Sequence, residues 1–453
     1  MQRIYGEAKQ ARGSGSPRVT RGFCCGVMAL AVGVAGCDTD VINPGPVADE
    51  TLDDEGAHAA VVAGMSYATS ATTWQLQLLG DEHTYNLTRG GRNFAGPKTP
   101  PVLGNLTSGG FSDGYWNTAH EARFTAEDGV RRFEEQVENP DSYDLMAWGL
   151  LYAANANRHL GENFCTAVFD AGEPQPGEAY FDRAIDYYER ALQVAGNAGE
   201  PEVELAAHAG LAQVLGPWKG QWDEAVTHAN QVPEDFTFEA EFGSSHTGEF
   251  NHIVYITDGN QWRDLTTKGT FFEDYYKETG DPRARWERTD EVTPDGLPLW
   301  RQRKWTSLSD NTNLKSGREM VLIEAEALLE QGQWQAAIEL INSLREGLEA
   351  DASGVMEGVE IDHPEGEQIP LWEAENEEEA WTALKTERRV ELWLEGRYMG
   401  DLRRWIENDT PGEQPDMSHR IRMCLPVAEN EIRDNPNIPG DFEDPINPIY
   451  TGG

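Results

Sequence analysis

Basic residues are scarce in this 453-residue chain, and lysine is the rarest of the charged types. The chain has 8 lysines and 28 arginines against 79 acidic residues, which gives a formal net charge of −43. A surface this acidic repels the phosphate backbone of DNA and RNA, so nucleic acid is excluded as a partner. The 14 Trp, 15 Phe and 14 Tyr residues supply enough apolar area for a core, so disorder throughout is excluded as well.

Cysteine is also scarce, with five residues, of which Cys24 and Cys25 lie in an N-terminal apolar run. Cys165 and Cys424 could form a disulfide in an oxidising compartment, but two buried free thiols are the expected outcome. The ten histidines are scattered, and neither H-E-x-x-H nor a Cys/His spacing typical of metal sites occurs. Neither a metal nor a cofactor is therefore expected.

Residues 1–36 have the pattern of a bacterial lipoprotein signal peptide. Five basic residues precede an apolar run, 23–36, that is too short to span a bilayer as a helix. The run ends Val34-Ala35-Gly36-Cys37, which resembles a lipobox, where the cysteine thiol is acylated and the signal is cut just before it. Cys37 is predicted to carry the lipid anchor, although an ordinary signal peptide followed by an incidental cysteine is the alternative. No later segment approaches the ~18 apolar residues that a membrane-spanning helix needs.

Four segments share the pattern of a helical hairpin. The motif G-Q-W-x-x-A occurs at Gly220–Ala225 and Gly332–Ala337, Phe181–Ile185 repeats its aromatic-x-x-Ala-Ile core, and Gly396–Leu402 repeats G-x-aromatic with a small residue at the alanine position. Each follows a stretch of helical periodicity, over 145–160, 202–215, 318–329 and 380–394. The pattern resembles the tetratricopeptide repeat, where Gly makes the turn and Ala allows close packing. The predicted fold is mainly α, with four hairpins, large loops and a few short strands.

An insertion separates the second hairpin from the third, because their spacing far exceeds one ~34-residue repeat. Residues 236–313 are rich in aromatics, Gly, Asp and Thr without helical periodicity, so we predict an irregular ligand-binding lobe there. The predicted N-terminal segment, 38–140, has short helices interrupted by a Gly/Pro/Asn-rich stretch at 88–114. The remaining predicted parts are repeats 1–2 over 141–235, repeats 3–4 over 314–408 and a turn-rich tail over 409–453.

Several motifs resemble the SusD/RagB family of nutrient-binding outer-membrane lipoproteins. Its C-terminal signature is similar to E-R-R-V-E-L at Glu387–Leu392, E-G-R-Y at Glu395–Tyr398 and D-L-R-R-W at Asp401–Trp405. Its central D-P-R motif, its third-repeat helices and its closing segment are similar to Asp281–Arg283, 319–345 and 425–438. The resemblance covers most of the sequence after the predicted signal and is strongest from residue 314 onward.

This resemblance implies a helical body of four hairpins, a ligand lobe made of loops, and no catalysis. It also implies docking over a TonB-dependent barrel transporter of the SusC type, to which captured oligosaccharide or peptide is delivered. The expected location is the outer membrane, where the protein is lipid-anchored and surface-exposed. The sequence leaves open whether the ligand is a glycan or a peptide, and which leaflet holds the anchor.

Aromatic residues outside the repeats are the candidates for ligand contact. Sugar rings stack their C–H faces on indole, while their hydroxyl groups need polar partners such as Arg, Asn and Asp. The candidate ligand-binding residues are Trp74, Asp81, His83, Tyr85, Asn86, Trp116, Trp262, Arg263, Trp300, Lys304 and Trp305. The alternative for each Trp is packing of the lobe onto the scaffold. The Trp residues in repeat positions, Trp222, Trp334, Trp393 and Trp405, are expected in the core.

Two other functions are the alternatives: a surface glycoside hydrolase or peptidase on a repeat scaffold, and a pure assembly scaffold. Gly110–Gly114 fits the nucleophile elbow G-x-S-x-G, but the residues before it make a poor strand. The charged residues of 387–403 are expected to form structural ion pairs with one another at i, i+3 and i+4 spacing. An assembly scaffold would have continuous repeats without the aromatic insertion. No catalytic residue is therefore predicted.

Overall fold

The structure is a computed structural model that describes residues 49–77, 84–85, 111–257, 265–292, 298–352, 360–414 and 423–444. Of residues 84, 85, 111, 112 and 265 it describes the backbone alone. The predicted signal peptide and Cys37 lie outside these ranges. Among the described helices, none is both long and apolar enough to cross a membrane.

Two long helices come first, after the short 3-10 turns η1 (Asp49–Asp53) and η2 (Glu55–Ala57). Helix α1 (His58–Leu76) packs against α3 (Phe111–Gln136). The prediction of short helices in this segment was wrong for α3, which begins inside the stretch assigned to the loop. A stripe of buried residues at helical spacing on α3 explains its length, namely Tyr115, Trp116, Ala119, Ala122, Ala126, Val130 and Phe133.

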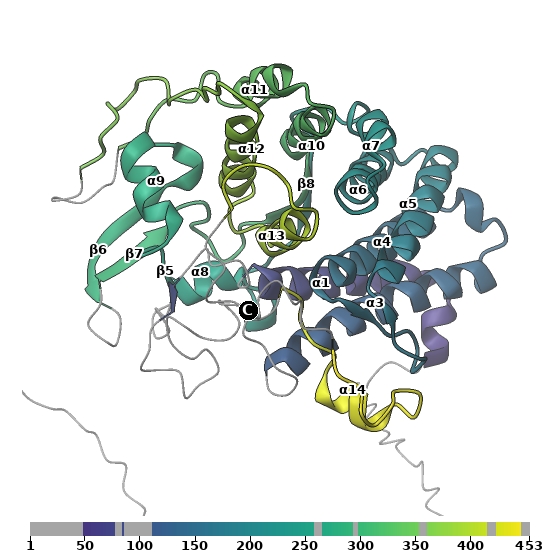
Figure 1. The fold of residues 1–453 in the computed structure, drawn as a ribbon. Coiled ribbons are helices and arrows are strands. Elements are labelled where there is room, and N and C mark those ends of the chain that lie inside the picture. The colour runs from purple at the N-terminus through teal and green to yellow at the C-terminus, as the bar shows by residue number, and fades with distance from the viewer. Residues whose placement is uncertain are drawn as a thin grey trace, which may run out of the picture. The chain divides into compact units, whose positions relative to one another are not determined.

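The four predicted hairpins are all present and form the helical body in Figure 1. They are α4 (Asp144–Asn163) with α5 (Glu178–Ala198), α6 (Pro201–Lys219) with α7 (Trp222–Ala229), α10 (Gly317–Glu330) with α11 (Trp334–Ser343), and α12 (Glu377–Glu391) with α13 (Tyr398–Glu407). Gly220, Gly332 and Gly396 precede the second helices with φ of +67°, +71° and +74°. This left-handed conformation favours glycine, so the turns form where the motif predicts them. The mainly α, tetratricopeptide-like fold is confirmed.

The alanine position of the motif is fully buried in the first three hairpins, where Ala184, Ala225 and Ala337 are each 0% exposed. The fourth hairpin differs from the prediction of a small residue there. Its equivalent position is Asp401, three residues after the aromatic Tyr398, and the Asp401 carboxylate accepts hydrogen bonds from Arg388 on α12 at 3.1 Å. An ion pair therefore replaces close alanine packing between the two helices of this hairpin.

The inserted lobe is more regular than its sequence predicts. It contains β4 (Thr237–Ala240), η5 (Thr247–Glu249), α8 (His252–Thr257), β5 (Leu265–Thr266), α9 (Phe271–Thr279), η6 (Pro282–Ala284), β6 (Trp286–Val292) and β7 (Pro298–Gln302), and leads into β8 (Thr312–Ser316). Strand β4 pairs with β8, so the two ends of the insertion lie side by side. Strands β6 and β7 form an antiparallel pair, and β5 pairs with β1 (Thr84–Tyr85) of the N-terminal segment.

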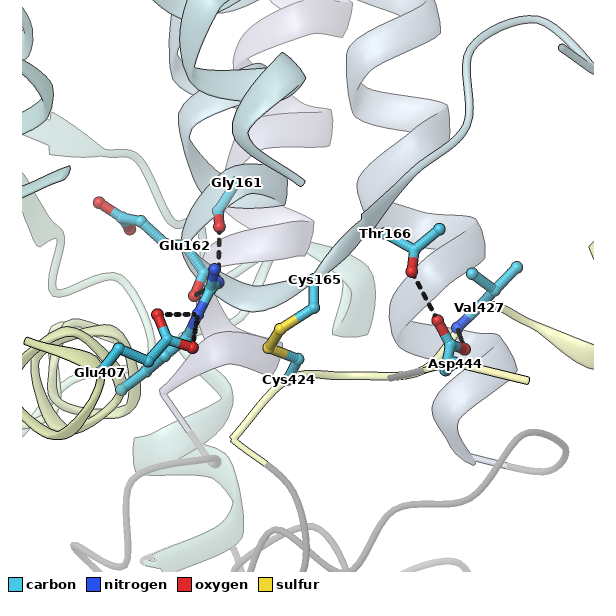
Figure 2. The surroundings of a disulfide bond; sticks show 9 residues. Gly161, Glu162, Cys165, Thr166, Glu407, Cys424, Val427 and Asp444 are labelled. Atoms are coloured by element: carbon cyan, nitrogen blue, oxygen red, sulfur yellow. Dashed lines mark hydrogen bonds and ion pairs between the residues drawn. A yellow bond between two sulfur atoms is a disulfide. The ribbon is translucent and has the colours of Figure 1, made fainter. Parts of the chain in front are cut away.

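The C-terminal tail is held against the end of α4 by a disulfide between Cys165 and Cys424, drawn in Figure 2. The expectation of two free thiols was wrong, because folding brings their Cα atoms to 5.5 Å across 259 residues of sequence. Asp444 strengthens the attachment by accepting hydrogen bonds from the Thr166 hydroxyl and the Val427 amide, at 2.8 and 2.6 Å. Within the described part of the tail, residues 409–414 and 423–444, the helix is α14 (Glu429–Asp434).

Candidate ligand-binding surface

The predicted ligand-binding residues divide into those that the structure describes and those that it does not. Asp81, His83, Asn86, Trp262 and Arg263 lie outside the described residues, and of Tyr85 only the backbone, in β1, is described. The pairing of β1 with β5 nevertheless places residues 84–85 beside the lobe. Parts of the N-terminal segment and of the insertion therefore meet.

Two of the candidate tryptophans lie inside the molecule against other rings. Trp116 is 2% exposed, and its ring packs against Phe164 with centroids 5.2 Å apart. Trp300, on β7, stacks on Trp286 at 4.5 Å, and the Lys268 ammonium lies 4.2 Å from the Trp300 ring centroid. These rings are thus engaged by protein groups in the described structure.

The last two of the described candidates near the lobe are Lys304 and Trp305. Trp305 is 6% exposed and belongs to the apolar cluster that includes Ile253 and Trp393. The Lys304 ammonium forms an ion pair with Glu395, at 2.8 Å. Both side chains connect the lobe to the fourth hairpin.

Trp74 has a different environment, because it lies on α1 and is partly exposed. Its indole stacks on the His252 ring with centroids 4.1 Å apart and planes 19° from parallel. His252 contacts Tyr255 edge-on at 5.7 Å, and Tyr255 contacts Phe250 at 5.5 Å. A continuous row of aromatic rings therefore runs from α1 across the start of α8.

Tyr67 adds a further ring from α1. It lies seven residues before Trp74, on the same face of the helix, and is 50% exposed. Its hydroxyl is close to η5, since a Cβ atom at Gly248 would come within 2.6 Å of it. We call the surface formed by Tyr67, Trp74, Phe250, His252 and Tyr255 the aromatic surface.

Asn251 fixes the short helix α8, which carries His252 and Tyr255 of this surface. Its side-chain oxygen accepts hydrogen bonds from the amides of Ile253 and Val254 at 3.1 and 3.2 Å, and its side-chain amide donates to the Asp310 carbonyl at 2.9 Å. The first bonds satisfy amides at the helix start, and the last ties the helix to the loop before β8. The flanking rings of Phe250, His252 and Tyr255 are held in place as a result.

Sequence reasoning named Trp74 and placed ligand binding in the lobe that contains residues 250–255, but it did not single out Phe250, His252, Tyr255 or Tyr67. The available signal was the run Phe250-Asn-His-Ile-Val-Tyr255, in which three rings flank the capping asparagine and two buried aliphatic residues. Burial lowers the pKa of His252, so its ring is neutral at pH 7. A partly exposed row of neutral rings suits stacking against sugar C–H faces or apolar peptide side chains, with hydroxyl groups at its edges for polar contacts.

Charged residues, most of them from the family-like motifs, form a separate and largely buried system, which we call the ionic network. It consists of Glu162, Asp281, Arg283, Arg318, Glu319, Glu326, Arg345, Glu387, Arg388, Glu391, Arg397, Asp401 and Arg404. The D-P-R arginine, Arg283, bonds to Glu387 at 2.5 Å and to Glu391 at 2.8 Å. The motif therefore fastens the lobe to α12.

The charged residues of 387–403 do form structural ion pairs, but the expectation that they pair with one another at i, i+3 and i+4 was wrong, because most partners are distant in sequence. Arg404 pairs with Glu326 of α10, and Arg397 bonds to Glu319 at 2.9 Å and to Glu162 at 3.1 Å. A pair at i, i+3 does join Arg404 to Asp401, at 2.9 Å, but Arg404 lies just outside the predicted group. The network thus joins the fourth hairpin to the third and the first.

Two glutamates one turn apart show how strongly local partners decide protonation. Burial alone would raise the pKa of Glu391, but hydrogen bonds from Arg318 and Arg283 lower it to about 2. Burial raises the pKa of Glu395 to about 7, and Lys304 only partly opposes this. Glu395 accepts hydrogen bonds from Lys304 and Asn313, at 2.8 and 3.2 Å, and belongs to the packing of the lobe.

The structure also bears on two other functions, catalysis at the G-x-S-x-G sequence and metal binding. Residues 111–114 of the G-x-S-x-G sequence form the first turn of α3, and Gly110 lies outside the described residues. Within the ranges that the structure describes, no group of three or more His, Cys, Asp and Glu side chains is placed to hold a metal ion. The absence of catalysis, metal and cofactor stays a prediction.

Comparison with known proteins agrees with the sequence motifs. The sequence model of the SusD family matches residues 251–446. No curated protein sequence matches this one.

Solved structures with the same fold align with this chain over nearly their whole length. A SusD-like carbohydrate-binding protein from Bacteroides vulgatus ATCC 8482 is 16% identical with a TM-score of 0.60, over 88% of this chain and 99% of that one. A SusD homologue from Bacteroides thetaiotaomicron VPI-5482 is 16% identical with a TM-score of 0.59, over 84% and 96%. A SusD-like carbohydrate-binding protein from Bacteroides fragilis NCTC 9343 is 14% identical with a TM-score of 0.59, over 85% and 99%.

The resemblance to the SusD/RagB family is therefore confirmed. Residues 251–446 carry the sequence pattern of the SusD family, and the described residues have the SusD-like fold.

Proposed function

We propose that this protein is a lipid-anchored, cell-surface protein that captures a nutrient on its aromatic surface and passes it to a TonB-dependent barrel transporter of the SusC type. The observation that carries the proposal is the partly exposed row of rings from Trp74 to Phe250, set in a SusD-like fold. Similar structures are described as carbohydrate-binding proteins, which favours a glycan over a peptide. Removal of residues 1–36 and acylation of Cys37 would supply the anchor.

Ligand capture and structural support would belong to different parts of the molecule. The aromatic surface belongs to α1 and to residues 250–255 of the inserted lobe, so capture would occur there. The hairpins over 141–235 and 314–408 would form the rigid support, with the helical repeats facing the transporter. A delivery protein has to release its cargo, so stacking on a few rings, at about 0.5–1.5 kcal/mol each, suits weak to moderate affinity.

The delivery role is tested in membranes from the native host. The protein is crosslinked mildly, solubilised in detergent and purified, and its companions are identified by mass spectrometry. We expect a large TonB-dependent barrel in near-stoichiometric amount, and fatty acids on Cys37. A barrel-free preparation would contradict the delivery role.

The enzyme alternative is tested with the same preparation. Incubation with cellohexaose, xylohexaose, mannohexaose and a tryptic digest of casein should leave each substrate intact, even where it binds. Release of shorter products that scales with protein concentration would contradict the non-catalytic role and favour a surface hydrolase.

A further inference from the structure

A pocket of about 220 Å³ lies between α9, α12, α13 and the segment after α13, and none of its lining residues belongs to the aromatic surface. Lys385 and Arg389, one turn apart on α12, both line it. Around them are the rings of Phe271, Tyr398 and Trp405. The pocket therefore combines two cations with an aromatic wall.

Neither cation has a carboxylate partner among the residues that the structure describes, although acids outnumber bases 79 to 36 in the whole sequence. The Lys385 ammonium donates to the Thr410 carbonyl at 3.3 Å, and it lies 5.7 Å from the Trp405 ring centroid. Glu326 and Asp409 both act electrostatically on Lys385, but neither is within ion-pair distance of it, and Glu326 is engaged by Arg404. Glu413 lines the pocket but is not within ion-pair distance of either cation.

Other charged residues on the same helix do have partners of opposite charge. Glu387, Arg388 and Glu391 of α12 all form ion pairs within the ionic network. Among the described residues, the charges on one face of α12 are thus paired, and the two positive charges on the pocket face have no carboxylate partner. An unpaired cation in a partly buried site attracts an anion from solution, because its charge is poorly screened there.

The shape of Arg389 fits one kind of anion well. Its guanidinium carbon lies 4.4 Å from the Phe271 ring centroid and 4.3 Å from that of Tyr398. Two rings at these distances restrict the movement of the guanidinium group. Its Nε atom is buried without a hydrogen-bond partner among the described residues. A fixed, planar set of donors matches the two oxygens of a carboxylate.

We propose that this pocket binds the carboxylate group of a small ligand, with Arg389 as the planar donor and Lys385 as a second positive charge. The volume admits a single sugar acid or the C-terminal residue of a peptide, and these two sources share the same anionic group. The site does not depend on the proposed capture function, since it uses none of the residues of the aromatic surface.

The test titrates the purified full-length protein with matched pairs of probes at pH 7. The pairs are D-glucuronate with D-glucose, and acetyl-Gly-Gly with its C-terminal amide. We expect at least one carboxylate to bind about tenfold or more tightly than its neutral partner, and the pair that shows the difference identifies the source. Equal binding of acid and neutral partner in both pairs would overturn the proposal, as would tighter binding of inorganic phosphate.

Variants locate the site. Arg389→Gln and Lys385→Met should each weaken binding of the preferred carboxylate by about tenfold, while Arg131→Gln, on the exposed face of α3, leaves it unchanged. If Arg389→Gln does not fold, as judged by its thermal transition, Lys385→Met decides. Unchanged binding in the folded variants would overturn the assignment. Trp74→Ala should leave carboxylate binding intact, which separates this site from the aromatic surface.

Discussion

The ionic network and the aromatic surface both place residues where proteins seldom have them. Charged side chains are almost never fully buried unless paired, yet Glu387 is 0% exposed between Arg283 and Arg345. Large aromatic rings are usually buried, yet Tyr67 is half exposed and Trp74 partly so. In the network, charges meet opposite charges inside the molecule. In the aromatic surface, contact area is left available for something outside it.

This contrast separates support from recognition. Buried pairs fix the relative positions of hairpins and lobe, since removal of one partner leaves a charge without compensation. Exposed rings add little to folding but supply stacking area to a ligand. Changes in the network should therefore alter stability first, and changes in the aromatic surface should alter binding first.

The largest expected effect is on stability, from Glu387→Ala. This change removes the carboxylate that accepts hydrogen bonds from both Arg283 and Arg345, so that Asp281 is the only carboxylate they still share among the described residues. It also removes the acceptor of the Trp372 indole N–H, which donates at 2.8 Å. We expect a loss of about 3–5 kcal/mol in the free energy of unfolding, measured with urea. The matched control, Glu135→Ala, breaks an exposed ion pair with Arg131 and should cost less than about 1 kcal/mol. Similar losses of unfolding free energy in both variants would contradict the distinction between buried and exposed ion pairs.

A smaller loss is expected when the disulfide is removed. The double variant Cys165→Ser with Cys424→Ser frees the tail from the end of α4 and should lower the free energy of unfolding by about 2–4 kcal/mol. Reductant should produce the same loss in the native protein and none in the double variant. Equal stability of native protein and variant under oxidising conditions would show that the thiols are free.

The pKa of Glu395 predicts a pH-dependent contribution to stability of up to about 3 kcal/mol. Its folded pKa of about 7 exceeds the ordinary value of 4.5, so the folded state holds the proton more tightly than the unfolded state. Stability from this group is greatest below about pH 4.5 and declines as the pH rises toward 7. Glu395→Gln should remove that decline, seen as a native-minus-variant difference that changes between pH 5 and 8. A constant difference would contradict the assignment.

The pKa of Glu391 predicts the opposite sign in acid. Because its folded value is about 2, Glu391 contributes stability above about pH 4.5 and loses that contribution as the pH falls toward 2. Glu391→Gln should therefore differ from the native protein most at pH 6 and progressively less toward pH 3. Urea unfolding across that range measures the difference, and a gap that widens in acid would contradict the pairing with Arg318 and Arg283.

Local patterns explain which parts of the fold the sequence predicts. The hairpins were predictable because a glycine turn, an aromatic residue and a small buried residue lie within six positions, as at Gly220–Ala225. Helix α3 was underestimated because its first turn contains Gly114 and follows a glycine-rich stretch, although its buried stripe is regular. The repeat motif did not predict the role of Asp401, because its carboxylate pairs with Arg388 on another helix.

Long-range partners explain what the sequence could not predict. The disulfide joins residues 259 apart, and Glu326 meets Arg404 only because α10 and α13 are brought together by folding. The same holds for the aromatic surface, where Trp74 stacks on His252 of a distant segment. Trp300 was as good a candidate for ligand contact as Trp74 in the sequence, but Trp286 and Lys268 occupy its ring in the folded protein.

The central claim, capture on the aromatic surface, is tested most directly by titration with whichever probe of the oligosaccharide and peptide panel binds tightest. The native protein, Trp74→Ala and Tyr255→Ala are compared with Phe124→Ala, which removes a ring that is 61% exposed on α3. We predict that both surface variants bind about tenfold or more weakly, about 1.4 kcal/mol, while Phe124→Ala binds like the native protein. Unchanged affinity in both folded surface variants, or no binding of any probe to the native protein, would contradict the account.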